Sequence, residues 1–269
     1  MTAWLDGALT EDPRIDPADR GFTLGDGLFE TLRLSGSRPR RLDRHLLRLR
    51  QGASLLGMPV PWDDGRLARG MAELAEATGI GDGVLRLTLS RGPGPRGLLP
   101  PAEQHPTTLM TLGPLPPPSG PARAVVSAVT RRNEHSPLAR IKSLSYLDGV
   151  LARLESARKG ADDAVLLNTA GRVAEARAAN LFIVAGGRPV TPPVGEGALP
   201  GTLRAVLIER RQAAERPLGI ADLAEADEAF LTSSLGIRPL VALDGRDIAG
   251  GLPGPVTRAL MAEVDGGGL

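Results

Sequence analysis

Apolar and polar residues alternate along several short segments of the chain, and this two-residue period predicts β-strands. Branched and aromatic side chains fill many of the apolar positions, as strands favour. In chain order the segments read FETLRL, VLRLTLS, ARAVVSAVT, DAVLLN, RVAEA, NLFIVA and EAFLTS.

Longer apolar spacings predict helices. The segment LDRHLLRLRQGASLLG reads as an amphipathic helix with leucines at 42, 46, 49, 55 and 56. Further along, leucines recur at three- to four-residue intervals, which predicts a helix over 143–159 whose leucine stripe packs on a core. The leucines of this stripe are Leu144, Leu147, Leu151 and Leu154. We expect two more helices at 202–214 and 255–264.

A proline-rich stretch, LGPLPPPSGPARAVV, interrupts these patterns at residues 112–126. Successive prolines continue neither a helix nor a strand ladder, and they favour a stiff extended connector. We therefore predict a small N-terminal α+β domain over 1–114, a linker over 115–121 and a larger C-terminal α+β domain over 122–269. Strands and helices mix in both halves without strict βαβ alternation, so two α+β domains fit better than one doubly wound sheet.

The composition excludes several classes of function. A hydrophobic content of 42% and a net charge of +1 are ordinary for a globular protein, and no long run of one charge indicates nucleic acid or a membrane surface as partner. The chain has no cysteine, and its three histidines lack metal-ligand spacing, so we expect neither a disulfide nor a metal site. Without an apolar leader or a span of about 18 apolar residues, the expected location is the cytoplasm.

Lysine is almost absent, since Lys142 and Lys159 are the only lysines among 32 basic residues. A lysine kept in so arginine-biased a chain is a candidate for chemistry that a guanidinium cannot perform. Lys159 has a sufficient structural explanation, because a cation and the following Gly160 suit the end of the predicted helix.

Lys142 lies just before that helix, where a positive charge opposes the helix dipole. Its neighbours Ile141 and Leu144 predict partial burial of the amine. Burial lowers the pKa of an ammonium group and releases a neutral nucleophile, whereas an arginine stays protonated. Local sequence leaves two alternatives open, a catalytic lysine and a structural one.

Four motifs in register extend over nearly the whole chain. They are DRGFTLGDGLFETLRL with RHLLRL, then IKSLSYLDGVLAR, then VAEARAANLFIV, and finally TPPVGEGALPGTLR. Together they resemble the fold-type IV pyridoxal-phosphate enzymes, also called class IV aminotransferases. The resemblance implies a two-domain fold like that of D-amino-acid aminotransferase, the cofactor pyridoxal 5'-phosphate and a homodimer.

The resemblance also implies roles for residues around the cofactor. Lys142 would form the Schiff base, Glu175 would contact the pyridine nitrogen, and Arg48 would bind the phosphate. Further cofactor contacts would come from Thr202, Leu203, Ser233 and Ser234. From the residues alone, Glu175 reads equally as an ordinary strand residue, Arg48 as part of a solvated helix face, and Thr202 as a helix cap.

Substrate-side residues decide the reaction, because the family's fold is shared by several. In branched-chain aminotransferases a tyrosine follows the Schiff-base lysine by five residues, but Leu147 stands at that position here. In D-amino-acid aminotransferases an arginine and a histidine grip the substrate carboxylate. Here Arg96 matches that arginine, while Leu98 replaces the histidine and Phe29 replaces a tyrosine.

The aminodeoxychorismate lyases resemble the chain more closely. Arg33 and Arg96 would supply two guanidinium groups to a substrate with two carboxylates, and Phe29 and Thr31 would lie beside them. An outward-facing strand arginine is the ordinary alternative for Arg33. We expect 4-amino-4-deoxychorismate lyase activity, with D-amino-acid transaminase as the alternative, because two arginines also suit D-glutamate.

A third alternative is a small-ligand binding protein that kept the fold without catalysis. The survival of Lys142 in a chain nearly free of lysine argues against it. The residues Arg132, Asn133 and His135 lie in the polar segment TRRNEHSPL, and the sequence assigns them no role.

Overall fold

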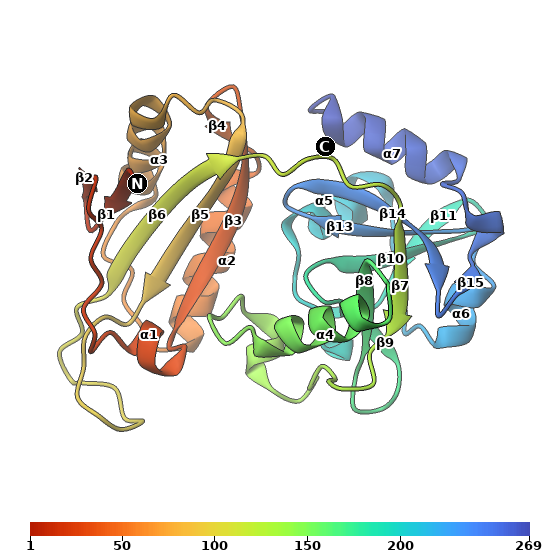
Figure 1. Ribbon diagram of the computed structural model, residues 1–269, viewed down its shortest axis with the longest axis horizontal. Coiled ribbons are helices and arrows are strands. Elements are labelled where there is room, and N and C mark those ends of the chain that lie inside the picture. The colour runs from red at the N-terminus through yellow and green to blue at the C-terminus, as the bar shows by residue number, and fades with distance from the viewer. The chain divides into compact units, whose positions relative to one another are not determined.

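The computed structural model describes all residues, 1–269, and the chain divides into two compact units. The first unit comprises Met1–Pro116 and Ile141–Ser145, and the second comprises Pro117–Arg140 and Tyr146–Leu269. The chain first passes from one unit to the other within the proline-rich stretch (Figure 1). Each unit has a sheet of its own, and the two-unit mixture of helices and sheets confirms the predicted α+β fold.

The first unit is built on a six-stranded sheet in the order β2-β1-β6-β5-β3-β4. Its strands are β1 (Ala3–Leu5), β2 (Ala8–Thr10), β3 (Gly27–Ser35), β4 (Arg38–Pro39), β5 (Gly83–Ser90) and β6 (Thr107–Pro114). Its helices are α1 (Arg20–Leu24), α2 (Leu42–Leu55) and α3 (Asp64–Thr78). The long strands β3, β5 and β6 pair antiparallel in continuous register.

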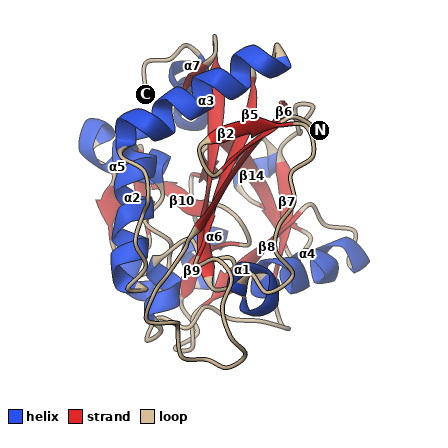
Figure 2. Cartoon of the chain, turned by 90° about the vertical axis from the view of Figure 1, so that its left-hand side faces the viewer, coloured by secondary structure: helices blue, strands red, loops and turns tan.

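Helices α2 and α3 pack on the sheet of the first unit (Figure 2). Every second residue of β3 and β5 enters the shared core, as the alternation predicts for strands buried on one face. The core of this unit consists of Trp4, Leu28, Leu32, Leu34, Leu46, Leu49, Ala53, Met58, Leu67, Met71, Leu74, Ala75, Leu85, Leu87, Leu89, Met110, Leu112 and Ile141.

The segment Ile141–Ser145 returns to the first unit after the chain has entered the second. It runs antiparallel to β3, with Leu28 paired to Ser143. The amide of Phe29 donates to the carbonyl of Lys142 at 2.9 Å, and the amide of Leu144 donates to the carbonyl of Gly27 at 2.9 Å. The backbone of Lys142 is thereby fixed to the sheet.

The second unit is built on a nine-stranded sheet in the order β12-β11-β10-β13-β14-β7-β8-β9, with β15 paired to β14. Its strands are β7 (Ala122–Val126), β8 (Asp163–Leu167), β9 (Val173–Ala176), β10 (Asn180–Ala185), β11 (Arg188–Thr191), β12 (Ala214–Glu215), β13 (Glu228–Ser233), β14 (Gly236–Leu243) and β15 (Arg246–Asp247). Its helices are α4 (Leu147–Arg158), α5 (Thr202–Arg211), α6 (Ile220–Ala224) and α7 (Pro255–Asp265), with 3₁₀ turns at Pro137–Arg140, Val194–Glu196 and Ala249–Gly251.

Helices α5 and α7 share a core with β10 and β13, where the rings of Phe182 and Phe230 stack with centroids 5.0 Å apart. Helix α4 packs on β8 through a smaller cluster around Ala152 and Leu166. None of the helices is both long and apolar enough to cross a bilayer.

The predicted leucine stripe of α4 is wrong. The helix begins at Leu147, after Leu144 has paired with the first unit, and Leu147 is 73% exposed. Leu151 and Leu154 are also exposed, and the helix buries Ala152, Glu155 and Ser156 instead. The helix face that carries Ala152 and Glu155 can approach the sheet, because Ala152 is small and the carboxylate of Glu155 is hydrogen-bonded. The leucine spacing therefore predicted burial of the wrong face.

The prediction for Lys159 is confirmed. Lys159 is the C-terminal cap of α4, and Gly160 follows with φ of 67°, the left-handed conformation that favours glycine. The ammonium of Lys159 donates to the carboxylate of Glu155 at 2.7 Å, one helical turn earlier. This lysine therefore has a structural role.

The Glu155 carboxylate ties α4 to the chain after β7. It accepts hydrogen bonds from the hydroxyl of Ser127 at 2.8 Å and from the amide of Ala128 at 3.1 Å. Burial alone would raise the pKa of Glu155, but the hydrogen bonds from Lys159, Ser127 and the backbone lower it to about 2.

We expect Glu155→Gln to lower the free energy of unfolding near neutral pH by about 1–3 kcal/mol, because the carboxylate loses charge-assisted hydrogen bonds. Since the folded-state pKa is depressed, this stabilisation is complete above the ordinary value of 4.5 and disappears as the pH falls towards 2. Urea unfolding between pH 2 and 7 measures it, with the exposed Glu76→Gln on α3 as control. If the free energy of unfolding of Glu155→Gln fell between pH 7 and pH 2 as steeply as that of the wild type, this role of Glu155 would be contradicted.

Candidate functional site

Lys142 lies against the ring of Phe29 on the first unit's sheet. The amine nitrogen of Lys142 is 4.3 Å from the ring centroid. The guanidinium of Arg86 lies over the same ring, with its Cζ atom 3.9 Å from the centroid. One aromatic ring thus brings together the candidate nucleophile and a guanidinium, an arrangement that cation–π attraction stabilises.

The sheet face away from α2 carries the predicted substrate residues. Phe29, Thr31 and Arg33 alternate along β3 with the core leucines, so they share this face. Arg86 on β5 is the direct cross-strand partner of Thr31, which places it on the same face. Arg86 was missed from the sequence, because its position in VLRLTLS reads as a solvated strand arginine among thirty arginines.

Arg48 belongs to a buried charged cluster on the opposite face of β3. The carboxylate of Glu30 accepts from Nε of Arg48 at 2.8 Å and from a terminal nitrogen at 2.5 Å. Nδ1 of His45 lies 2.6 Å from the same carboxylate. Burial raises the pKa of Glu30, but the hydrogen bonds from Arg48 and His45 outweigh it and the net pKa is lowered. Burial lowers the pKa of His45 despite the neighbouring carboxylate.

The two parallel hydrogen bonds to Glu30 orient the guanidinium of Arg48. Arg48 is only 9% exposed, so it does not belong to a solvated helix face.

Glu175 lies on β9 of the second unit and is 7% exposed. One carboxylate oxygen lies 3.1 Å from Nε of Arg132, and the other accepts the amide of Leu199 at 2.9 Å. The side-chain amide of Asn180 lies 3.4 Å from that second oxygen and donates to the carbonyl of Leu199 at 2.7 Å. Glu175 is therefore a fixed buried carboxylate, and Arg132 gains the role of its partner, which the sequence did not assign.

Helix α5 begins beside Asn180. Gly201 is its N-terminal cap, so Thr202 is the first helical residue and not the cap. The side chain of Leu203 enters the core with Phe182 and Phe230, which leaves only its backbone amide for a ligand. A Cβ atom on Gly201 would lie 1.9 Å from Oδ1 of Asn180, so only glycine fits there. Backbone amides at a helix start favour an anion such as phosphate.

Ser233 ends β13, and its hydroxyl accepts the amide of Leu235 at 3.2 Å. Ser234 follows in the turn that leads to β14. Both belong to the second unit, as do Glu175 and α5.

Arg96 lies on the long loop between β5 and β6 and is exposed. It forms no ion pair within the chain, and the structure does not bring it into contact with Phe29, Thr31 or Arg33. Asn133 accepts the amide of His135 at 3.1 Å, and the His135 side chain is 81% exposed, so these two residues form a surface turn.

Comparison with known proteins agrees with this geometry. The family model for amino-transferase class IV matches residues 27–243. A putative branched-chain-amino-acid aminotransferase of Methanocaldococcus jannaschii is 33% identical over 97% of the chain and 94% of the relative. A D-alanine aminotransferase of Bacillus licheniformis is 28% identical over 96% of the chain and 94% of the relative.

Among solved structures, the chain is similar to a 4-amino-4-deoxychorismate lyase from Pseudomonas aeruginosa. The TM-score is 0.84 and the identity 35%, over 98% of both chains. The three relatives have names for three different reactions, so the names do not select one.

We expect Gly201→Ala to lower the free energy of unfolding by about 1–3 kcal/mol, because the added Cβ displaces Asn180 and overpacks the start of α5. Chemical unfolding measures the loss, and Gly195→Ala, where no atom lies within 4 Å of the new Cβ, is the matched control. The second change Asn180→Ser should recover part of the loss by removing the overlap. Equal stability of Gly201→Ala and Gly195→Ala would contradict the packing argument.

Proposed function

Because the chain belongs to the class IV aminotransferase family, we propose that it is a 4-amino-4-deoxychorismate lyase, which releases pyruvate and 4-aminobenzoate. Family membership makes it a pyridoxal-phosphate-dependent enzyme of the aminotransferase and lyase group. The choice of reaction is the proposal, and it rests on the substrate-side residues of the first unit.

The observation that supports the lyase is the pair of cations on the ring of Phe29. A substrate whose amino group meets Lys142 can place a carboxylate on Arg86, which lies over the same ring. Arg33 lies on the same sheet face and supplies a second guanidinium. Two guanidinium groups on the sheet face that carries the amine match a substrate with an amino group and two carboxylates.

The residues fit the cofactor that the family uses. Its phosphate needs backbone amides and hydroxyl donors, which the start of α5, Ser233 and Ser234 supply within the second unit. Arg48 of the first unit stays the phosphate cation that the resemblance predicts. Gly201 admits no side chain at the start of that helix. A ring nitrogen that must stay protonated needs a buried carboxylate, and Glu175 is one, oriented by Arg132 and Leu199.

When bound, pyridoxal phosphate supplies an electron sink that stabilises negative charge on a substrate carbon. Lys142 would hold the cofactor and, as a freed amine, would take the proton from the ring carbon that bears the amino group and deliver it to the methylene carbon of the departing enolpyruvyl group, which becomes the methyl group of pyruvate. Glu175 would keep the ring nitrogen of the bound cofactor protonated. Arg33 and Arg86 would orient the two substrate carboxylates, Arg96 is the further guanidinium that the resemblance predicts, and pyruvate would leave as the six-membered ring becomes aromatic.

The substrate residues fit the other reactions of the family less well. The position of the branched-chain tyrosine is Leu147, whose side chain is 73% exposed at the start of α4. Leu98 cannot complete a carboxylate trap with Arg96, because it has no hydrogen-bond donor. Phe29 likewise lacks the hydroxyl of the tyrosine that it replaces.

The test is turnover of 4-amino-4-deoxychorismate, with 4-aminobenzoate measured by fluorescence and pyruvate by a coupled dehydrogenase. We expect equal amounts of both products from the wild type and none from Lys142→Ala. Amino transfer from D-alanine to 2-oxoglutarate, with no 4-aminobenzoate formed, would contradict the lyase proposal and favour a D-amino-acid transaminase. Retained turnover in Lys142→Ala would contradict both reactions.

We expect Arg86→Lys to raise KM for 4-amino-4-deoxychorismate ~10-fold with a smaller change in kcat, because an ammonium cannot bind a carboxylate through two parallel hydrogen bonds. Arg14→Lys is the matched control, since Arg14 is 85% exposed and pairs only with Asp12. An unchanged KM in Arg86→Lys would show that Arg86 does not bind the substrate.

A further inference from the structure

We propose that Arg20 is a positioning residue that fixes the loop carrying Arg96, and that it acts on substrate binding through this loop. The role in substrate binding rests on the proposed function, whereas the anchoring of the loop does not. The loop joins β5 to β6 and lies beside α1 beyond the end of the sheet (Figure 1). Its sequence, GPGPRGLLPPAEQHP, forms no helix or strand of its own.

Arg20 is the first residue of α1, and it is 3% exposed although it carries a charge. Its Nε donates to Asp26 at 2.9 Å, and its two terminal nitrogens donate to the carbonyls of Gly97 and Leu98, each at 2.9 Å. These carbonyls belong to the two residues that directly follow Arg96. A buried guanidinium needs such partners, and its three nitrogen atoms each reach a different acceptor, whereas an ammonium would have to reach all three acceptors from a single nitrogen atom.

Asp26 joins this anchor to the start of the loop. Its carboxylate also accepts two hydrogen bonds from Arg91, at 2.8 and 3.0 Å. Arg91 in turn donates to the side chain of Gln104 near the other end of the loop, at 2.8 Å. Both ends of the loop and its tip are therefore connected through one carboxylate and two buried arginines.

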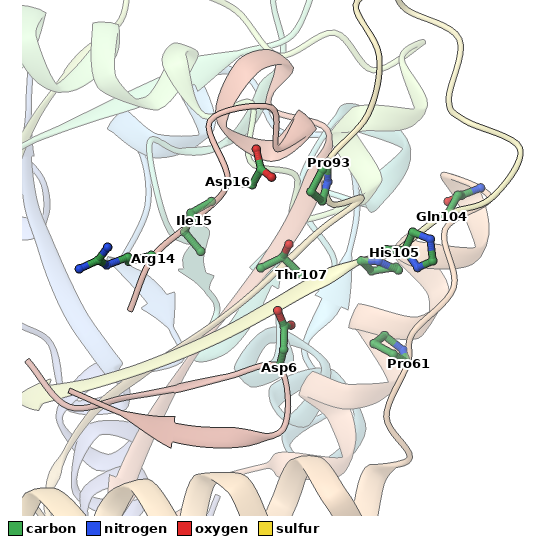
Figure 3. A pocket seen from close by; sticks show the side chains of 10 residues that line it. Asp6, Arg14, Ile15, Asp16, Pro61, Pro93, Gln104, His105 and Thr107 are labelled. Atoms are coloured by element: carbon green, nitrogen blue, oxygen red, sulfur yellow. The ribbon is translucent and has the colours of Figure 1, made fainter. Parts of the chain in front are cut away.

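A second set of contacts holds the base of the loop. The carboxylate of Asp19 accepts from the hydroxyls of Ser90 at 2.7 Å and Thr107 at 2.8 Å. These two residues end β5 and begin β6. Figure 3 shows Thr107 beside a surface pocket of the first unit, with Pro93 and Gln104 from the two ends of the loop also lining it. The base is thus fixed independently of Arg20, which leaves the tip at residues 95–100 as the part that depends on Arg20.

The tip itself has little else to hold it. Leu98 and Leu99 are 83% and 85% exposed, so neither is anchored in the core. Gly97 has φ of 118°, a conformation that few other residues adopt, and the guanidinium of Arg20 contacts its carbonyl. Without Arg20 the tip would sample many conformations, and Arg96 would lose its fixed position relative to the sheet.

The first test is limited trypsin digestion of the holoenzyme at the Arg96–Gly97 bond. In Arg20→Lys we expect cleavage there to be ~10-fold faster, because two hydrogen bonds that hold the bond in a folded turn are lost. Cleavage after the exposed Arg14 serves as internal reference within the same digest. If Arg20→Lys folds poorly by circular dichroism, Asp26→Asn, which weakens the same anchor, replaces it. Equal cleavage at Arg96 in the variants and wild type would overturn the inference.

The second test is a double-mutant cycle on substrate binding. We expect Arg20→Lys to raise KM severalfold with kcat nearly unchanged, and to have no further effect when Arg96→Ala is already present, since Arg20 acts through Arg96. Additive effects of the two changes would show that Arg20 acts elsewhere and would overturn the positioning role. Absence of lyase turnover in the wild type would refute the proposed function alone, while trypsin digestion would still decide the anchor.

Discussion

The arrangement of the first unit depends on the backbone pairing between β3 and the segment Ile141–Ser145. Two hydrogen bonds of 2.9 Å hold this segment to the sheet, and Ile141 enters the core beneath it. The pairing fixes the backbone of Lys142, so the amine reaches the ring of Phe29 without a helix or strand of its own. A single lysine on a free loop would lose that position, because side-chain chemistry needs a rigid scaffold.

Buried or half-buried carboxylates orient the arginines that the chain uses in place of lysine. Glu30 fixes Arg48, Asp26 fixes Arg20 and Arg91, and Glu175 faces Arg132. In each case the planar guanidinium gives the pair a direction that an ammonium would not. The arginine bias of the composition therefore suits a protein whose charged groups are held in place by geometry.

Sequence patterns predicted much of the fold. Strands buried on one face show alternating apolar residues, and strands buried on both faces show continuous apolar runs, so both kinds can be recognised in the sequence. The seven predicted strands are present as β3, β5, β7, β8, β9, β10 and β13. The exposed leucines of α4 show where the period fails, since a helix can bury small and hydrogen-bonded residues and leave leucines outside. Helices α1, α3 and α6 were not predicted, nor were the long strands β6 and β14 or the short strands β1, β2, β4, β11, β12 and β15.

The candidate site was predicted less completely. Family motifs drew attention to Lys142 and Glu175, but they assigned no role to Arg86, Arg20 or Arg132, whose roles come from contacts with residues distant in sequence. No local pattern separates one of these arginines from the twenty-nine others. The homodimer expected from the resemblance stays a prediction.

The division of the candidate residues between the units bears on how one fold serves several reactions. All candidate substrate residues and Lys142 belong to the first unit, whereas Glu175 and the start of α5 belong to the second. Cofactor chemistry is common to the family, so Glu175 and the start of α5 are not where we expect the reactions to differ. The sheet face with Phe29, Thr31 and Arg33 can change by single side chains without disturbing the core on its other side, because alternate residues of a strand face opposite ways. Side chains on this face of the first unit can therefore change without altering the fold or the candidate cofactor residues of the second unit.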